Sequence, residues 1–212
     1  MTVRKVVTRR SNHFRGYFPS LKNQKPVPWE SQLEGAFFRL LELSPAVISY
    51  VVQPSEERVP SAQGYFKYYP DVRVFLSDGR DWWFEVKPEE RLNIARVRDR
   101  LETAERHFIS TGRNFSVVTD KLIEEEPLAS NLRHLMSHRR GPVLSAEKLE
   151  EVLTVLNDQV PKTVSDLLLA VGERPGWRLL GLGIVGIELN KPLDTNSPIF
   201  LQGGHRHADL FP

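Results

Sequence analysis

The chain has 212 residues, which is enough for one domain with a proper hydrophobic core and a smaller second unit. Because it contains no cysteine, disulfides, thiolate zinc sites and cysteine nucleophiles are excluded, and any bound metal is expected to be one that prefers oxygen ligands. No apolar run reaches the about 18 residues of a membrane helix. Together with an ordinary hydrophobic content of 40%, this favours a cytoplasmic protein with no membrane partner.

The charge is distributed unevenly along the chain, although the net charge is only +2. Residues 1–29 form a basic arm with no acidic residue. Its cations are Arg4, Lys5, Arg9, Arg10, Arg15, Lys22 and Lys25. Phosphate binding is one use for such an arm, and a merely solvated basic N-terminus is the alternative.

The first half of the chain predicts a helix followed by strands. Apolar residues recur at helical spacing in residues 30–44, after a proline that suits a helix start. Strands are then predicted at residues 47–52, 65–69, 72–76 and 82–86, where β-branched and aromatic residues gather. Asp78-Gly79 lies between the last two strands and is a strong hairpin signal.

A crossover connection is predicted next. Residues 92–110 carry an apolar stripe at helical spacing, residues 115–118 are strand-like, and residues 122–136 again have a helical pattern. A hairpin-rich segment followed by strand, helix and strand indicates a mixed α/β sheet flanked by helices.

The composition changes near residue 140, and the rest of the chain predicts a small separate module. Three helices (residues 146–156, a second from 163 and a third at 177–180) and two strands (184–188 and 199–201) suggest a winged-helix-like domain, and a helical cap on the first domain is the alternative. The tail, with His205 and His207, is expected to be flexible. The predicted division is therefore a basic arm (1–29), a main domain (30–140), a winged-helix-like domain (141–203) and a tail (204–212).

The residues that point to chemistry lie on the two strands of the Asp-Gly hairpin. Asp71 lies on one strand, in Tyr69-Pro70-Asp71-Val72, and Glu85 and Lys87 share a face of the other because side chains alternate along a strand. Hairpin pairing can bring Asp71 beside them. Two carboxylates can hold Mg²⁺ or Mn²⁺, with the Val86 carbonyl as a further ligand, while Lys87 can assist an attacking water and stabilise charge on a phosphate. This set suits phosphodiester hydrolysis.

A structural interpretation competes with each of these residues. An acid and a lysine on an exposed hairpin could be an incidental ion pair, although Trp82-Trp83-Phe84 marks a buried strand, where an unneeded charge is costly. Glu34 on the upstream helix could point into the same site or be a solvated helix carboxylate. Glu30 suits a charge at the helix start, and Gln53 either contacts the cleft or caps a turn.

Taken in order, these segments resemble the TnsA-like endonucleases, subunits of heteromeric cut-and-paste transposases that nick the 5′ ends of the element. The similarity covers about residues 14–137. It rests on Arg15-Gly16-Tyr17-Phe18-Pro19-Ser20-Leu21-Lys22, Glu30-Ser31-Gln32-Leu33-Glu34, Val51-Val52-Gln53-Pro54, Tyr69-Pro70-Asp71, Phe84-Glu85-Val86-Lys87-Pro88 and the strand Phe115-Ser116-Val117-Val118-Thr119-Asp120.

The resemblance implies a restriction-endonuclease-like fold of the PD-(D/E)xK type. It implies that Asp71 and Glu85 bind catalytic Mg²⁺, that Glu34 completes the acidic site and that Lys87 assists the water. Some relatives carry Gln at the position of Glu85, so the metal ligands can differ in detail. The implied partners are double-stranded transposon-end DNA, an RNase H-like transposase subunit and an ATPase regulator, in a bacterial cytoplasm.

Two rival functions remain open at this point. One is a free-standing PD-(D/E)xK nuclease of restriction, repair or phage biology, and the other is a non-catalytic DNA-binding protein that keeps the fold as a scaffold. DNA contacts are predicted at Arg15, Lys22, Arg96 and Arg100, with Arg98, Arg106, Arg139 and Arg140 as further candidates, and a solvated basic helix face is the alternative.

Overall fold

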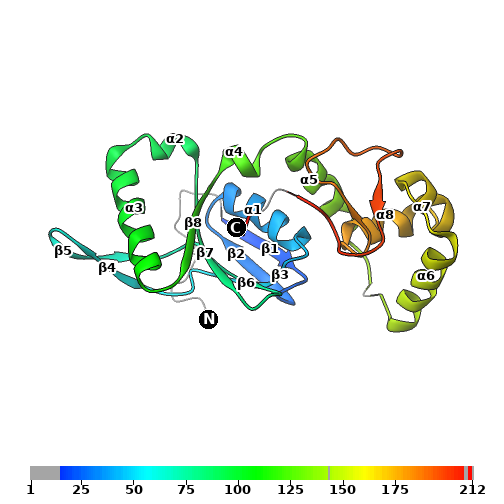
Figure 1. The fold of residues 1–212 in the computed structure, drawn as a ribbon, viewed down its shortest axis with the longest axis horizontal. Helices are drawn as coiled ribbons and strands as arrows, with labels where there is room; N and C mark the ends of the chain where they lie inside the picture. Colours follow the sequence, from blue (N-terminus) through cyan, green and yellow to red (C-terminus); the bar gives the residue numbers. More distant parts are fainter. Residues whose placement is uncertain (1–14, 143, 208–209, 212) are drawn as a thin grey trace. The chain divides into compact units, whose positions relative to one another are not determined.

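The computed structural model describes residues 15–142, 144–207 and 210–211, so the first half of the predicted basic arm lies outside the described residues. The chain divides into two compact units (Figure 1). The described part of unit 1 comprises residues 15–42, 46–125 and 211, and that of unit 2 comprises residues 43–45, 126–142, 144–207 and 210. The division at residues 125 and 126 differs from the predicted boundary near residue 140, because the helix of residues 128–138 packs in unit 2.

Unit 1 is a mixed α/β unit. Its strands are β1 (Gly16–Ser20), β2 (Lys25–Trp29), β3 (Val47–Val52), β4 (Glu57–Ser61), β5 (Gly64–Tyr68), β6 (Val72–Leu76), β7 (Asp81–Lys87) and β8 (Asn114–Thr119). Its helices are α1 (Gln32–Leu43), α2 (Glu89–Leu92), α3 (Ala95–Ser110) and α4 (Asp120–Ile123). The two hairpins β1–β2 and β4–β5 form separate sheets of two strands each.

The central sheet has the strand order β3-β6-β7-β8. Strands β3, β6 and β7 are antiparallel neighbours, whereas β7 and β8 are parallel and are joined through α2 and α3. The predicted mixed sheet with a crossover is therefore confirmed. Val72 pairs with Phe84, so the residue before Val72 lies across from the residue after Phe84. This register places Asp71 opposite Glu85.

Strand β7 is buried on both faces, which explains its run of aromatic residues. On one face, Phe84 packs edge-on against Phe37 of α1 with ring centroids 5.3 Å apart. On the other face, Trp83 packs against Phe108 of α3 at 5.2 Å. Because side chains alternate along a strand, Glu85 and Lys87 point to the same side as Trp83.

A second core lies between α3 and the β4–β5 hairpin. Phe108 is fully buried and stacks on Phe115 of β8 with ring centroids 4.9 Å apart. The complete cluster of buried residues is Val59, Tyr68, Trp83, Leu101, Ala104, Phe108 and Phe115. It fixes the hairpin to the helix.

Two predicted helices are interrupted. The helix predicted at residues 92–110 is split into α2 and α3 at Asn93-Ile94, and the helix predicted at 122–136 is split into α4 and α5 (Leu128–His138). Pro127 precedes α5 and lacks the backbone N–H that a continuous helix would use at that position. The hairpin β1–β2 and the strand β4 were not predicted. Each of these three strands contains proline, which is uncommon inside strands and weakens their sequence signal.

Unit 2 contains α5, three further helices and a short strand pair. These are α6 (Ala146–Gln159), α7 (Val164–Val171), α8 (Glu173–Gly181), β9 (Gly186–Ile187) and β10 (Ile199–Phe200). Helix α7 begins with a capping box between Thr163 and Asp166. Helices and an antiparallel strand pair occur in the predicted order, but each strand has only two residues, and the winged-helix assignment stays a prediction.

The C-terminal tail was predicted to be flexible, and this prediction is wrong for His205. This side chain is only 1% exposed, its Nδ1 accepts a hydrogen bond from the Ile187 amide at 3.1 Å, and its Nε2 lies 2.8 Å from the Leu180 carbonyl. His207 contacts the Ser44 hydroxyl at 2.9 Å. In the described residues, no helix combines the length and the apolar character needed to cross a bilayer.

Candidate active site

The predicted catalytic residues meet where β6 begins and β7 ends. The Lys87 ammonium lies 2.7 Å from Glu85 Oε1 and 3.5 Å from Asp71 Oδ2. The Val86 amide donates to Asp71 Oδ2 at 2.8 Å, which holds this carboxylate against β7. Glu85 is 5% exposed, and the side chains of Asp71 and Lys87 are 14% and 33% exposed. Three ionisable groups therefore share a largely buried corner at the end of the sheet.

Tyr68 is a member of the site that the sequence analysis missed. Its hydroxyl donates to Glu85 Oε2 at 2.6 Å from the last position of β5. Burial raises the pKa of Tyr68, and the Glu85 carboxylate raises it further, so the phenol stays protonated and remains a donor. The signal in the sequence is an alternating strand that ends directly before Tyr69-Pro70-Asp71. Without the pairing of β4 and β5, that signal could not tell which tyrosine faces the site.

Glu34 comes from the first turn of α1 and is 7% exposed. Its carboxylate accepts hydrogen bonds from the Glu30 amide at 3.0 Å and the Ser31 hydroxyl at 3.2 Å. Burial and the nearby Asp71 charge raise its pKa to about 7. Glu34 thus stabilises the helix start, and its pKa depends on the charge of Asp71.

A further set of contacts surrounds Glu34. The Arg15 guanidinium lies 3.0 Å from the Glu30 carboxylate, which also accepts a hydrogen bond from Gln53 Nε2 at 3.0 Å. Gln53 donates its backbone N–H to the Asp71 carbonyl at 2.8 Å. The structure therefore links Gln53 and Glu30 to the site, whereas sequence reasoning left their roles between cleft contact and local capping.

The carboxylates of Asp71 and Glu85 lie close together, and their charges shift the pKa values of the groups in this corner. Burial, followed by the neighbouring Glu85 charge, raises the pKa of Asp71 to about 7. Burial alone would lower the pKa of Lys87, but the Asp71 and Glu85 charges outweigh it and raise the pKa above its ordinary value. Lys87 is therefore charged at neutral pH.

The donors suit a hard divalent cation by their chemistry. Carboxylate oxygens of Asp71, Glu85 and Glu34 and the Val86 carbonyl are the ligand types that Mg²⁺ and Mn²⁺ prefer. Mutual repulsion of the buried carboxylates would be relieved by a cation. However, no three histidine, aspartate or glutamate side chains of the described chain already form a metal cage, and Lys87 contacts both Asp71 and Glu85.

The predicted DNA contacts are in varied environments. Arg15 pairs with Glu30, and Lys22 donates to the Val47 carbonyl at 2.6 Å. Arg100 donates to the Lys67 carbonyl at 2.5 Å and lies over the Phe66 ring. Arg96 is exposed on α3. Three of the four side chains thus make contacts within the protein, and DNA binding by them stays a prediction.

A comparison with protein families identifies the part of the chain that carries this corner. Residues 44–120 match the family model described as TnsA-like endonuclease N terminal. The chain carries a TnsA-like endonuclease domain. Asp71, Glu85 and Lys87 lie within the matched residues of this domain, whereas Glu34 lies before them. No curated protein matches the chain.

The TnsA-like match confirms the resemblance seen in the sequence and indicates a nuclease related to transposase subunits. It agrees with the central mixed sheet and flanking helices of unit 1. For such a nuclease, DNA is the substrate and a transposase the partner in general.

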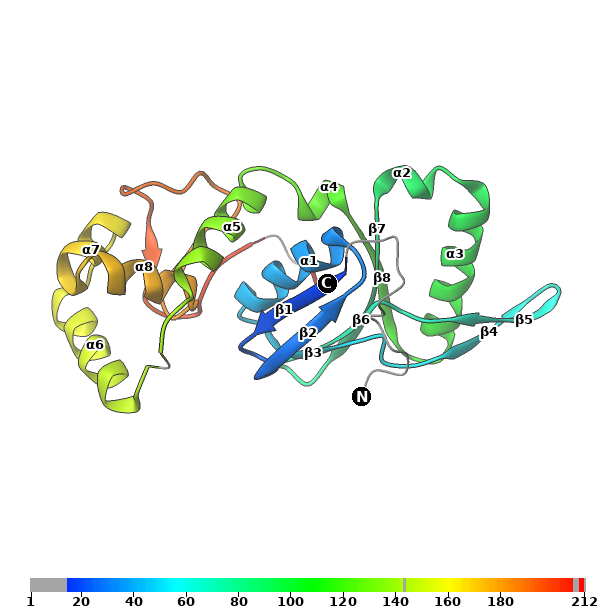
Figure 2. The ribbon, with the colours of Figure 1, turned by 180° about the vertical axis from the view of Figure 1, so that it is seen from behind.

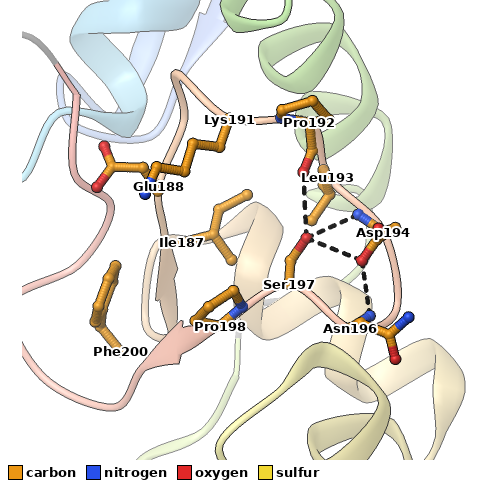
Figure 3. A pocket seen from close by; sticks show the side chains of 10 residues that line it. All are labelled: Ile187, Glu188, Lys191, Pro192, Leu193, Asp194, Asn196, Ser197, Pro198 and Phe200. Carbon is orange, nitrogen blue, oxygen red and sulfur yellow. Dashed lines mark hydrogen bonds between the residues drawn. The ribbon is translucent and has the colours of Figure 1, made fainter.

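Unit 2 has a cavity of a different kind, shown in Figure 3. It measures about 460 Å³ and is lined by Glu188, Lys191 and a hydrogen-bonded turn that contains Asp194, Asn196 and Ser197. Asp194 accepts a hydrogen bond from the Asn196 amide at 2.8 Å, and Ser197 accepts one from the Asp194 amide at 2.9 Å. Ile187, Pro198 and Phe200 supply apolar walls. These groups do not bring two carboxylates and a lysine together as Asp71, Glu85 and Lys87 do in unit 1.

Proposed function

We propose that this protein is a Mg²⁺-dependent DNA endonuclease that hydrolyses phosphodiester bonds at the 5′ ends of a transposon, acting as the nuclease subunit of a heteromeric transposase. The convergence of Asp71, Glu85 and Lys87 on a TnsA-like domain carries the proposal. An RNase H-like transposase subunit and an ATPase regulator are the proposed partners. Mn²⁺ is expected to replace Mg²⁺.

Asp71 and Glu85 are the proposed metal ligands, together with the Val86 carbonyl and Glu34. A bound divalent cation would activate water and neutralise charge on the phosphate. Two contacts on the chain orient these ligands, because the Val86 amide holds Asp71 and the Tyr68 hydroxyl holds Glu85.

Lys87 is proposed to bind the scissile phosphate. Its ammonium is charged and 33% exposed on the side chain, so it can turn from the carboxylates towards an incoming anion. In that position it would stabilise the negative charge that develops on phosphate oxygens and orient the attacking water. This role of Lys87 requires a charged ammonium group, which its raised pKa maintains.

The burial of this set argues against the non-catalytic alternative. A protein that only binds DNA has no use for three nearly buried carboxylates whose charges disfavour one another, since such groups usually destabilise a fold. A free-standing nuclease would share the same site. Assays with and without the proposed partner proteins distinguish such a nuclease from a transposase subunit.

The test is metal binding and DNA nicking by Asp71→Asn. Wild type is expected to bind Mn²⁺ in calorimetry and to nick supercoiled DNA in Mn²⁺, and the variant is expected to lose both, with nicking reduced at least about a hundredfold. Glu105→Gln, which neutralises an exposed carboxylate on α3, is the matched control and should behave as wild type. Transposase and ATPase subunits are added in parallel because the nuclease can depend on its assembly.

Thermal unfolding separates loss of function from loss of fold. Asp71→Asn should unfold at the same temperature as wild type or a few degrees higher without metal, because it removes a buried charge from a repulsive pair. Equal nicking by wild type and Asp71→Asn would contradict the proposal. DNA binding without any metal-dependent nicking by the assembled wild type would favour the scaffold function.

A further inference from the structure

The hairpin formed by β4 and β5 is a narrow ribbon that projects from unit 1. Figures 1 and 2 both show it extending past α3, away from the four-stranded sheet. Strands of five residues make it roughly 17 Å long. Its base belongs to the candidate active site, because Tyr68 bonds to Glu85 and Asp71 follows three residues later. The ribbon therefore begins at the proposed site of cleavage.

The inner face of the ribbon is fixed to α3. Val59 is fully buried in the α3 core, and Arg100 holds the strand carbonyl of Lys67 while covering Phe66. At the base, Arg113 makes two hydrogen bonds to Glu57, at 2.9 and 3.1 Å. These contacts make the projection firm, and such a firm ribbon can position a ligand.

The outer face of the ribbon carries an exposed aromatic ring between cations. Tyr65 is 67% exposed, and the Arg58 guanidinium lies 5.5 Å from its ring. Arg58 is the direct cross-strand partner of Lys67, an arrangement of like charges that destabilises an isolated hairpin. Residues 58–67 contain no carboxylate, and Lys67 pairs at 2.7 Å with Glu56 outside this range. This face suits an anion.

The opposite side of the ribbon tip also offers donors. A hollow of about 620 Å³ lies between the tip and α3. It is lined by Pro60, Ser61, Ala62, Thr103, Arg106, His107 and Ser110, which supply three hydroxyls, one guanidinium and one imidazole but no carboxylate. Arg106 donates to the Glu102 carbonyl and to Thr103 Oγ1 at 3.2 Å each, and His107 lies 3.7 Å from Glu57.

We propose that the β4–β5 ribbon enters the major groove of duplex DNA next to the cleaved bond, with Arg58 and Lys67 facing one phosphate backbone and Arg106 facing the other. This inference rests on the proposed nuclease function and extends its DNA contacts to a surface outside the catalytic set. The major groove is about 12 Å wide and admits a two-stranded ribbon, which leaves a phosphate backbone on each side. Tyr65 then lies against the edge of the bases.

The experiment measures binding of the full chain to fluorescein-labelled duplex DNA of arbitrary sequence, by anisotropy in EDTA over a range of salt concentrations. The double variant Arg58→Ala/Lys67→Ala is expected to bind about tenfold more weakly, and the slope of log K against log salt should fall by about 2 because two phosphate contacts are lost. Arg106→Ala should reduce the slope by about 1. Tyr65→Ala should weaken binding about tenfold, whereas Tyr65→Phe keeps the ring and should bind as wild type.

Lys148→Ala is the matched control, since Lys148 is also exposed and also pairs with a glutamate at 2.7 Å, in unit 2. Unchanged melting temperatures exclude unfolding of the variants. Ribbon variants that bind DNA with wild-type affinity and slope would overturn the inference. The inference would also be overturned if the ribbon variants changed only the self-association of the chain, measured by sedimentation. The ribbon edges would then serve pairing between copies of the chain.

The readouts keep this inference separate from the proposed function. If the inference about the ribbon is wrong, the ribbon variants bind DNA normally while wild type still nicks DNA. If the proposed function is wrong, wild type does not nick DNA, whether or not the ribbon variants bind DNA normally.

Discussion

Lys87 is the residue that makes a crowded acidic corner compatible with folding. It lies 2.7 Å from Glu85 and 3.5 Å from Asp71, and all three side chains are largely shielded from water. Breaking a buried ion pair by removing one partner typically costs about 3–5 kcal/mol, because the other charge stays buried and unpaired. The lysine therefore has a structural role in the metal-free protein as well as a proposed role at the phosphate.

His205 gives a prediction at the same scale that concerns unit 2. Burial lowers its pKa to about 4, against a favourable hydrogen bond to the Leu180 carbonyl. The folded pKa lies below that of the unfolded chain, about 6.5, so the unfolded state binds more protons between these values. The contribution to stability is complete above about pH 6.5 and is lost as pH falls towards 4, up to about 3 kcal/mol.

Calorimetric unfolding at pH 7.5 and pH 5 checks this prediction. His205→Gln offers an acceptor and a donor without a titrating group, so its unit 2 transition should change less between the two pH values than that of wild type. An equal decrease in both proteins would show that other groups cause the pH dependence.

At the scale of the element, α3 is the support of both the sheet and the ribbon. Phe108 is fully buried and contacts Phe115 and Trp83 of the sheet and Tyr68 of the ribbon. A helix that carries many charged residues is thus held in place by a narrow apolar stripe. The stripe was predicted from helical periodicity, but its contact with the unpredicted β4 strand was not.

Phe108→Ala is expected to destabilise unit 1 by about 3–5 kcal/mol, because it removes a buried ring and leaves a cavity. The neighbouring Ile109 is 61% exposed, so Ile109→Ala on the same helix should change stability by less than about 0.5 kcal/mol. Urea unfolding followed by circular dichroism measures both. Equal effects would mean that α3 is not packed through Phe108.

At the scale of the whole molecule, two units have separate cores. The corner of Asp71, Glu85 and Lys87 belongs to unit 1, and Tyr68, Val86 and Glu34 lie in the same unit. Unit 2 instead depends on close backbone packing, because a Cβ added at Gly186 would lie 1.8 Å from the Gly204 carbonyl oxygen. Damage to one unit can therefore be tested against the function of the other.

Gly186→Ala is expected to unfold unit 2 at a lower temperature while leaving Mn²⁺ binding by unit 1 intact. The three atoms nearest to the added Cβ are backbone atoms of Gly204 and His205, so no side-chain movement can relieve the clash. Calorimetry gives the unfolding transitions, and titration with Mn²⁺ gives the binding. Loss of Mn²⁺ binding in this variant would show that the units are not independent in folding.

The sequence by itself determined the mixed α/β class, the positions of α1, β3, β6, β7 and β8, and the resemblance to the TnsA-like endonucleases, which the family model matches at residues 44–120. These features depend on local spacing: alternating side chains put Glu85 and Lys87 on one face, and the Asp-Gly turn set the pairing that brings Asp71 to them. The catalytic roles of these residues and the winged-helix assignment stay predictions.

Tertiary structure alone decided which distant groups complete the corner and how the rest of the chain is divided. Tyr68 reaches Glu85 only because the β4–β5 hairpin packs on α3, and Arg15, Glu30 and Gln53 meet only through the placement of α1. His205 was expected in a flexible tail, yet unit 2 buries it against Ile187 and Leu180. Such contacts join residues far apart in the chain, and local periodicity carries no information about them.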